Sequence, residues 1–168
     1  MLAPDTPLVW VRSHTPACTQ LNMAEARFVS ELLAAAIAGG LGADQVAAVT
    51  PFRRQAMLIR NHLQARLGAS RPLPIVDTVE RVQGMTVELV ALSACASDPD
   101  YIAHLAGFLL SPNRLNVAAS RARVKVVLVA SPEALAETPL EYDALLAQQA
   151  WRSFVGRAAC VADLPGAD

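Results

Sequence analysis

The sequence predicts an α/β fold in which helices cover both faces of a parallel β-sheet. Short apolar runs alternate with longer amphipathic segments, and this alternation favours parallel strands joined by helical crossovers. The 168-residue chain is 54% hydrophobic and only 17% charged, which suits strands that are buried on both faces. We expect a single domain over residues 1–157, because a chain of this length supports one hydrophobic core.

Five strands are expected, each as an apolar run that ends at a polar or proline-bearing stretch. The helices between them follow from periodic apolar positions and capping residues; Asn22 and Glu25, for example, have the spacing of a capping box. The expected strands are 8–11, 45–50, 73–77, 87–92 and 124–130, and the expected helices are 22–39, 53–67, 98–109, 112–121 and 141–154. Residues 158–168 are expected to form a frayed tail.

Composition excludes several classes of protein. The net charge is -1 and the sequence pI about 6.3, so any contact with nucleic acid must be local. Cys18, Cys95 and Cys160 are far apart and have no histidines at ligand spacing, which indicates free thiols and no metal site. The sequence has neither a signal peptide pattern nor an apolar run long enough to span a membrane. We therefore expect a cytoplasmic protein that does not enter a membrane.

Ligands of parallel sheets bind at the carboxyl ends of the strands, and a dense polar turn follows the third expected strand there. It runs from Asp77 to Gly84. Gly84 allows a positive φ or a close approach of the backbone to a ligand, and the hydroxyl, amide and N–H groups nearby commonly contact phosphates. A solvated loop with no ligand is the alternative interpretation.

Two arginines mark the helix expected over residues 112–121. At about 100° per residue, Arg114 and Arg121 share one face of that helix. Two guanidinium groups on one face suit a phosphate, because each planar group can donate two hydrogen bonds and stays charged. Surface arginines paired with acidic residues remain the alternative.

A third polar cluster runs from Thr50 to Gln55, at the start of the helix expected over 53–67. The amide of Gln55 should point toward the edge of the sheet, where it needs a hydrogen-bond partner. Either a ligand or an ordinary hydrogen bond at the start of the helix would satisfy it.

Nucleotide-binding sequence motifs are absent from these 168 residues. The sequence contains neither G-x-x-x-x-G-K-[ST] nor G-x-G-x-x-G, and it lacks a convincing acidic pair after a strand for magnesium. We therefore expect this chain to be unable to hydrolyse a nucleotide by itself.

The three polar clusters, in order, resemble motifs IV, V and VI of superfamily 1 helicases, with the Upf1/Dna2-like branch as the nearest match. The matching segments are 49–55, 76–84 and 115–123, and Asn22-x-x-Glu25-Ala26 resembles the segment before motif IV. The resemblance covers approximately Leu8 to Ser131. It implies a three-layer RecA-like (P-loop NTPase-like) domain that lacks the P-loop, which is the second motor domain of such a helicase.

The resemblance also implies roles for individual residues. Arg121 matches the arginine finger of motif VI, which reaches the γ-phosphate of ATP bound with Mg²⁺ by a P-loop domain of the same protein. Single-stranded nucleic acid, with DNA favoured over RNA, is the expected second partner. We assign nucleotide binding to Arg53, Arg54, Gln55, Gln83, Gly84, Thr86 and Arg114, nucleic-acid binding to Thr50, Pro51, Thr78 and Arg81, and no residue to a metal.

Three positions depart from the family pattern. Thr86 stands where the family usually has a glutamate that helps to position the nucleotide, and Glu88 falls where an aspartate is common. Ala56 stands where some relatives have a second arginine for the γ-phosphate. These departures motivate an alternative function, a non-catalytic nucleic-acid-binding or regulatory module descended from a helicase. A complete α/β nucleotide-binding protein unrelated to helicases is a third hypothesis.

Overall fold

The structure is a computed structural model that describes residues 5–109, 111–136 and 142–164. It contains six strands: β1 (Leu8–Arg12), β2 (Val46–Thr50), β3 (Ile75–Thr78), β4 (Val87–Ser93), β5 (Ala122–Ala130) and β6 (Cys160–Asp163). The α-helices are α1 (Met23–Ala38), α2 (Arg53–Leu67), α3 (Pro99–Leu109), α4 (Pro112–Ala119), α5 (Glu133–Ala136) and α6 (Tyr142–Val155). Two short 3-10 helices are η1 (Ala43–Gln45) and η2 (Val79–Arg81).

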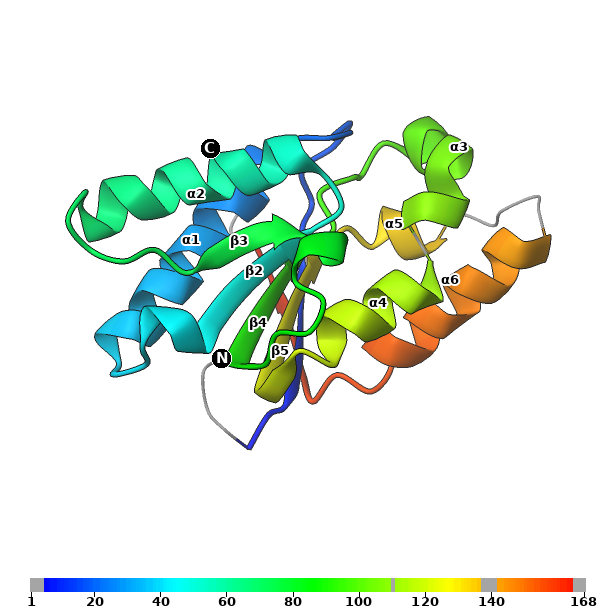
Figure 1. Ribbon diagram of the computed structural model, residues 1–168. Helices are drawn as coiled ribbons and strands as arrows, with labels where there is room; N and C mark the ends of the chain where they lie inside the picture. The colour runs from blue at the N-terminus through cyan, green and yellow to red at the C-terminus, as the bar shows by residue number, and fades with distance from the viewer. Residues whose placement is uncertain (1–4, 110, 137–141, 165–168) are drawn as a thin grey trace.

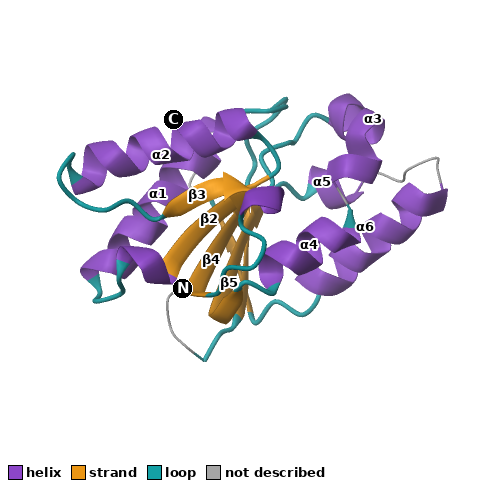
Figure 2. Cartoon of the chain, in the orientation of Figure 1, coloured by secondary structure: helices purple, strands orange, loops and turns teal. Residues whose placement is uncertain are grey.

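All six strands pair in parallel, in the order β3-β2-β4-β5-β1-β6. This confirms the α/β fold with a parallel sheet. Two helices, α1 and α2, cover one face of the sheet, and α3 to α6 lie on the other (Figure 1). The three layers are also visible when helices and strands are coloured separately (Figure 2).

Side chains that point alternately to the two faces of the sheet explain why helices cover both faces. Val127 and Val129 of β5 pack in one cluster with the apolar faces of α1 and α2. Leu128 and Ala130 of the same strand pack in a second cluster with α4, α5 and α6. Successive side chains of a strand point to opposite faces, so a strand that is apolar throughout must be covered on both.

One prediction about the carboxyl-terminal segment is wrong. Residues 158–168 are expected to fray, yet Cys160–Asp163 forms β6 and pairs with β1 over four residues. The amide of Leu164 also donates to the carbonyl of Arg12 at 2.7 Å, and Arg12 forms an ion pair with Asp163 at 2.8 Å. A strand this short has no sequence period of its own, and its pairing to a strand about 150 residues away stabilises it.

Helix α4 also differs from expectation. The sequence predicts a helix over 112–121, whereas α4 ends at Ala119 and only two residues precede β5. Arg121 therefore lies in the connection to β5 and not on the helix. No helix in the described part of the chain is long and apolar enough to cross a membrane.

Candidate functional site

The structure divides the expected site residues between two edges of the sheet, here called the carboxyl edge and the amino edge after the strand ends that they contain. Thr50 and Thr78 are the last residues of β2 and β3 and lie at the carboxyl edge. Thr86 and Arg121 directly precede β4 and β5 and lie at the amino edge. The sequence predicts these residues at one edge of the sheet, whereas the structure places them at two.

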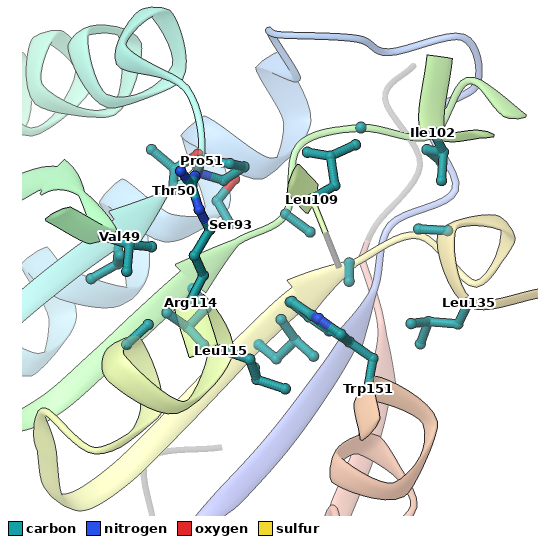
Figure 3. A pocket seen from close by; sticks show the side chains of 18 residues that line it. Val49, Thr50, Pro51, Ser93, Ile102, Leu109, Arg114, Leu115, Leu135 and Trp151 are labelled. Atoms are coloured by element: carbon teal, nitrogen blue, oxygen red, sulfur yellow. The ribbon is translucent and has the colours of Figure 1, made fainter. Parts of the chain in front are cut away.

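Arg114 lies in the first turn of α4 and reaches the carboxyl edge. Figure 3 shows its side chain extending from α4 toward Thr50 and Pro51, along the wall of a cavity. Its Nη2 forms an ion pair with Glu80 at 2.7 Å, and its guanidinium carbon lies 3.7 Å from the centroid of the Phe108 ring. Arg114 is therefore held in place by one acid and one aromatic ring.

The cavity beside Arg114 has a volume of about 60 Å³. Its walls are mainly apolar and come from β2, β4, β5 and the helices α3 to α6. Three residues that line it each have a buried polar atom with no hydrogen-bond partner among the described residues: Thr50 Oγ1, Arg114 Nη1 and Trp151 Nε1. A hydroxyl and a guanidinium N–H thus remain available to a polar ligand at this edge.

Glu80 is an acidic residue at this edge that was not among the site residues predicted from the sequence. Partial burial alone would raise its pKa, but hydrogen bonds from its own backbone and the Thr78 hydroxyl, with the charges of Arg114 and Arg53, hold the pKa below its usual value. Glu80 therefore remains ionised and fixes Arg114. Its place in the polar turn 77–84 is the sequence signal that points to it.

Three further arginines give the carboxyl edge an exposed positive surface. Arg53 and Arg54 are the first two residues of α2, and both are exposed. Arg81 ends η2 with a side chain that is 62% exposed, and it lies 3.7 Å from Asp77. Such a local group of cations can attract a polyanion although the whole chain carries a net charge of -1.

Arg121 at the amino edge is attached to the loop that contains Gly84. Its Nη1 donates to the Met85 carbonyl at 3.1 Å, and its Nε donates to the Val117 carbonyl at 3.0 Å. Its Nη2 donates to the Ser120 hydroxyl at 3.0 Å. The guanidinium has five N–H groups, so these three contacts leave one donor on each terminal nitrogen without a partner among the described residues.

The loop before β4 presents its other expected site residues to solvent. Gly84 has a φ of 85°, a left-handed conformation that glycine adopts without strain. Gln83, Gly84 and Thr86 are all exposed. These residues and Arg121 form one continuous surface at the amino edge, because the amide of Val87 donates to the Arg121 carbonyl at 2.9 Å.

Three expectations about single residues need correction. Arg114 and Arg121 do not converge on one helix face, because α4 ends before Arg121 and the two side chains contact opposite edges. Gln55 is buried, and its side-chain amide is hydrogen-bonded to Asn22 and Ser93, so residues of the protein satisfy the amide for which the sequence also allowed a ligand. Thr78 is also buried, and its hydroxyl binds Glu80.

A family model described as an AAA domain matches residues 10–133, which include both edges of the sheet. The chain belongs to this AAA domain family. It is also similar to known helicases: 34% identical over 124 residues to "Regulator of nonsense transcripts 1 homolog" of Arabidopsis thaliana, and 31% identical over 146 residues to "DNA replication ATP-dependent helicase/nuclease DNA2" of Mus musculus.

These alignments cover 71% and 83% of this chain but only 10% and 13% of the two relatives. The chain thus spans about a tenth of the length of the curated relatives it matches. Among solved structures, the C-terminal domain of a possible DNA helicase from Lactobacillus plantarum WCFS1 aligns with 83% of this chain and 82% of that one, at 16% identity and a TM-score of 0.48. The sequence matches confirm the resemblance of this AAA domain to the Upf1/Dna2-like branch of superfamily 1 helicases.

Proposed function

We propose that this AAA domain is the second motor domain of an ATP-dependent helicase and completes an ATP site that a P-loop domain of the same protein holds. The observation that carries the proposal is the environment of Arg121. Its guanidinium is fixed by three contacts beside the Gly84 loop, and within the part of the chain that the structure describes one N–H on each terminal nitrogen has no partner. Two such donors can bind one phosphoryl group through two oxygens.

Arg121 acts in this proposal as an arginine finger. ATP with Mg²⁺, bound by the P-loop domain, supplies the γ-phosphoryl group on which negative charge develops during transfer to water. The carbonyls of Val117 and Met85 hold the guanidinium before the reaction, so little reorganisation is needed as that charge develops. The exposed Gln83, Gly84 and Thr86 line the same surface and would contact the nucleotide.

The carboxyl edge binds single-stranded nucleic acid in this proposal. Exposed Arg53, Arg54 and Arg81 can neutralise backbone phosphates. Contacts of this kind hold the sugar-phosphate backbone without reading base sequence. We propose DNA as the substrate, although the names of relatives include both a DNA replication helicase and a "Probable RNA helicase armi".

The test is steady-state ATP hydrolysis by the full-length protein, with and without single-stranded DNA. Arg121→Ala should lower kcat by about 10³-fold, and Arg121→Lys should restore little, because lysine keeps the charge but lacks the planar fork. Arg123→Ala is the matched control: Arg123 is two residues away, its side chain is 66% exposed and it pairs with Glu88 at 3.4 Å.

The Arg123 variant should hydrolyse ATP at nearly the normal rate. The 168-residue chain alone should show no ATPase activity, since it lacks a P-loop. Normal turnover by the Arg121→Ala protein would refute the assignment of the finger.

A further inference from the structure

A buried polar cluster lies between the two helices that cover one face of the sheet and is not explained by the proposed function. Each of its members is at most 1% exposed: Ser13, Asn22, Glu25, Gln55, Ser93 and Cys95. Buried polar groups on this scale are costly unless each is hydrogen-bonded. Their partners therefore show what the cluster holds together.

Glu25 is the acceptor at the centre of the cluster. Its Oε2 accepts hydrogen bonds from the Ser93 hydroxyl at 2.7 Å and from the Cys95 amide at 3.0 Å. Its Oε1 accepts from the Asn22 side chain at 3.2 Å. One carboxyl group thus joins the start of α1 to the end of β4.

Gln55 connects the same cluster to α2. Its Oε1 accepts from the backbone N–H of Asn22 at 2.9 Å, while its Nε2 donates to the backbone carbonyl of Asn22 at 3.0 Å and to the Ser93 hydroxyl at 3.1 Å. The Ser93 hydroxyl accepts from Gln55 and donates to Glu25. The three side chains therefore form one directional network, in which replacing any member leaves a buried neighbour without a partner.

This network carries two features that packing alone does not require. Burial raises the pKa of Glu25 from 4.5 to about 7, whereas an apolar side chain at this position would avoid that cost. Cys95 has a φ of 69°, a left-handed conformation that is strained for a residue with a Cβ. Its amide is held by Glu25, so the network maintains a local backbone strain at the carboxyl edge.

The segment attached to this network is the one that carries the exposed cations. Gln55 is the third residue of α2 and directly follows Arg53 and Arg54. Phe52, which precedes the helix, provides no side-chain cap. The contacts of Gln55 therefore determine where the start of α2 lies relative to the sheet.

We propose that Glu25, acting through Ser93 and Gln55, is a positioning residue for nucleic-acid binding that fixes the turn from Thr50 to Arg54 at the carboxyl edge. This inference rests on the proposed function, in which that edge holds single-stranded nucleic acid. The finger Arg121 is bonded to Met85 and Val117 at the amino edge and shares no contact with the network. Disturbing Glu25 should therefore alter binding of nucleic acid more than hydrolysis of ATP.

The experiment measures ATPase activity of the full-length protein against the concentration of a short oligothymidylate. Glu25→Gln places an N–H₂ group where the network requires an acceptor, and Ser93→Ala removes the hydroxyl that joins Gln55 to Glu25. Each variant should raise the oligothymidylate concentration for half-maximal stimulation by about fivefold or more, while KM for ATP and kcat at saturation change by less than about twofold. Glu31→Gln, an exposed glutamate of α1 paired with Arg66, is the matched control and should change none of these values.

Thermal unfolding of each protein is measured first, so that the ATPase assays can be run at a temperature below every unfolding transition. Half-saturation within about twofold of the wild-type value in both variants would overturn the inference. A parallel loss of kcat, ATP affinity and oligothymidylate affinity would also overturn it, because that pattern indicates general structural damage. An Arg121-dependent ATPase with unchanged half-saturation would refute only this inference, whereas turnover independent of Arg121 would refute the proposed function.

Discussion

Replacing Glu25 by glutamine should remove much of the dependence of folding stability on pH between about pH 5 and pH 8. The carboxyl group is fully buried, and burial raises its pKa from 4.5 to about 7, although Ser93, Cys95 and Ser13 donate hydrogen bonds that oppose the rise. The folded protein thus binds the proton more tightly than the unfolded chain does. Glutamine has nearly the same shape and no proton to lose.

The direction of this pH dependence follows from the protonation state of Glu25 that the folded protein prefers, which is the neutral carboxyl group. A raised pKa means that the stabilisation is complete below the unfolded value of 4.5 and is lost as pH rises through about 7. At about 1.4 kcal/mol per pKa unit, this shift corresponds to a loss of about 3 kcal/mol from low to high pH. Among the described residues, the titratable groups that interact electrostatically with Glu25 are the thiols of Cys18 and Cys95. Burial raises the pKa of both thiols, so neither is ionised between about pH 5 and pH 8.

The assay is urea unfolding at several pH values between about 5 and 8, followed by tryptophan fluorescence. The free energy of unfolding of the wild type minus that of Glu25→Gln should fall by about 2.5 kcal/mol from pH 5 to pH 8, because the rest of the loss occurs below pH 5. Glu31→Gln, on the exposed surface of the same helix, should follow the wild-type pH profile. A difference between wild type and Glu25→Gln that stays constant across this pH range would refute the burial argument.

Two substitutions test other parts of the fold by urea unfolding. Gly84→Ala should destabilise the protein by about 1 kcal/mol, because a residue with a Cβ is strained at a φ of 85°. No atom within 4 Å would obstruct the added Cβ, so the strain lies in the backbone alone. A more stable Gly84→Ala protein, as is found where glycine has an ordinary φ, would contradict this. Leu63→Ala should cost about 2–5 kcal/mol, because Leu63 is fully buried under α2. Met57→Ala on the same helix, where Met57 is 60% exposed, should stay within about 0.5 kcal/mol of wild type, and equal effects of the two substitutions would contradict the assigned burial.

The sequence alone determined the class of fold and most of its elements. The apolar run within β5 and the caps of α1 are local signals, because they depend on neighbouring residues and on the period of a strand or helix. The order of motifs also determined the family, which the AAA domain match confirmed. These signals are contained within short segments and need no knowledge of how the segments pack.

Tertiary structure decided the partners of the polar residues. Gln55 binds a residue 33 positions away, Glu25 binds Ser93 68 positions away, and Arg121 binds Met85 36 positions away. The edge strand β6 likewise depends on β1 at the other end of the chain. A hydrogen bond depends on distance and angle in space, and sequence spacing gives neither once the chain has crossed the sheet, so a spacing argument placed Arg114 and Arg121 together where the structure separates them.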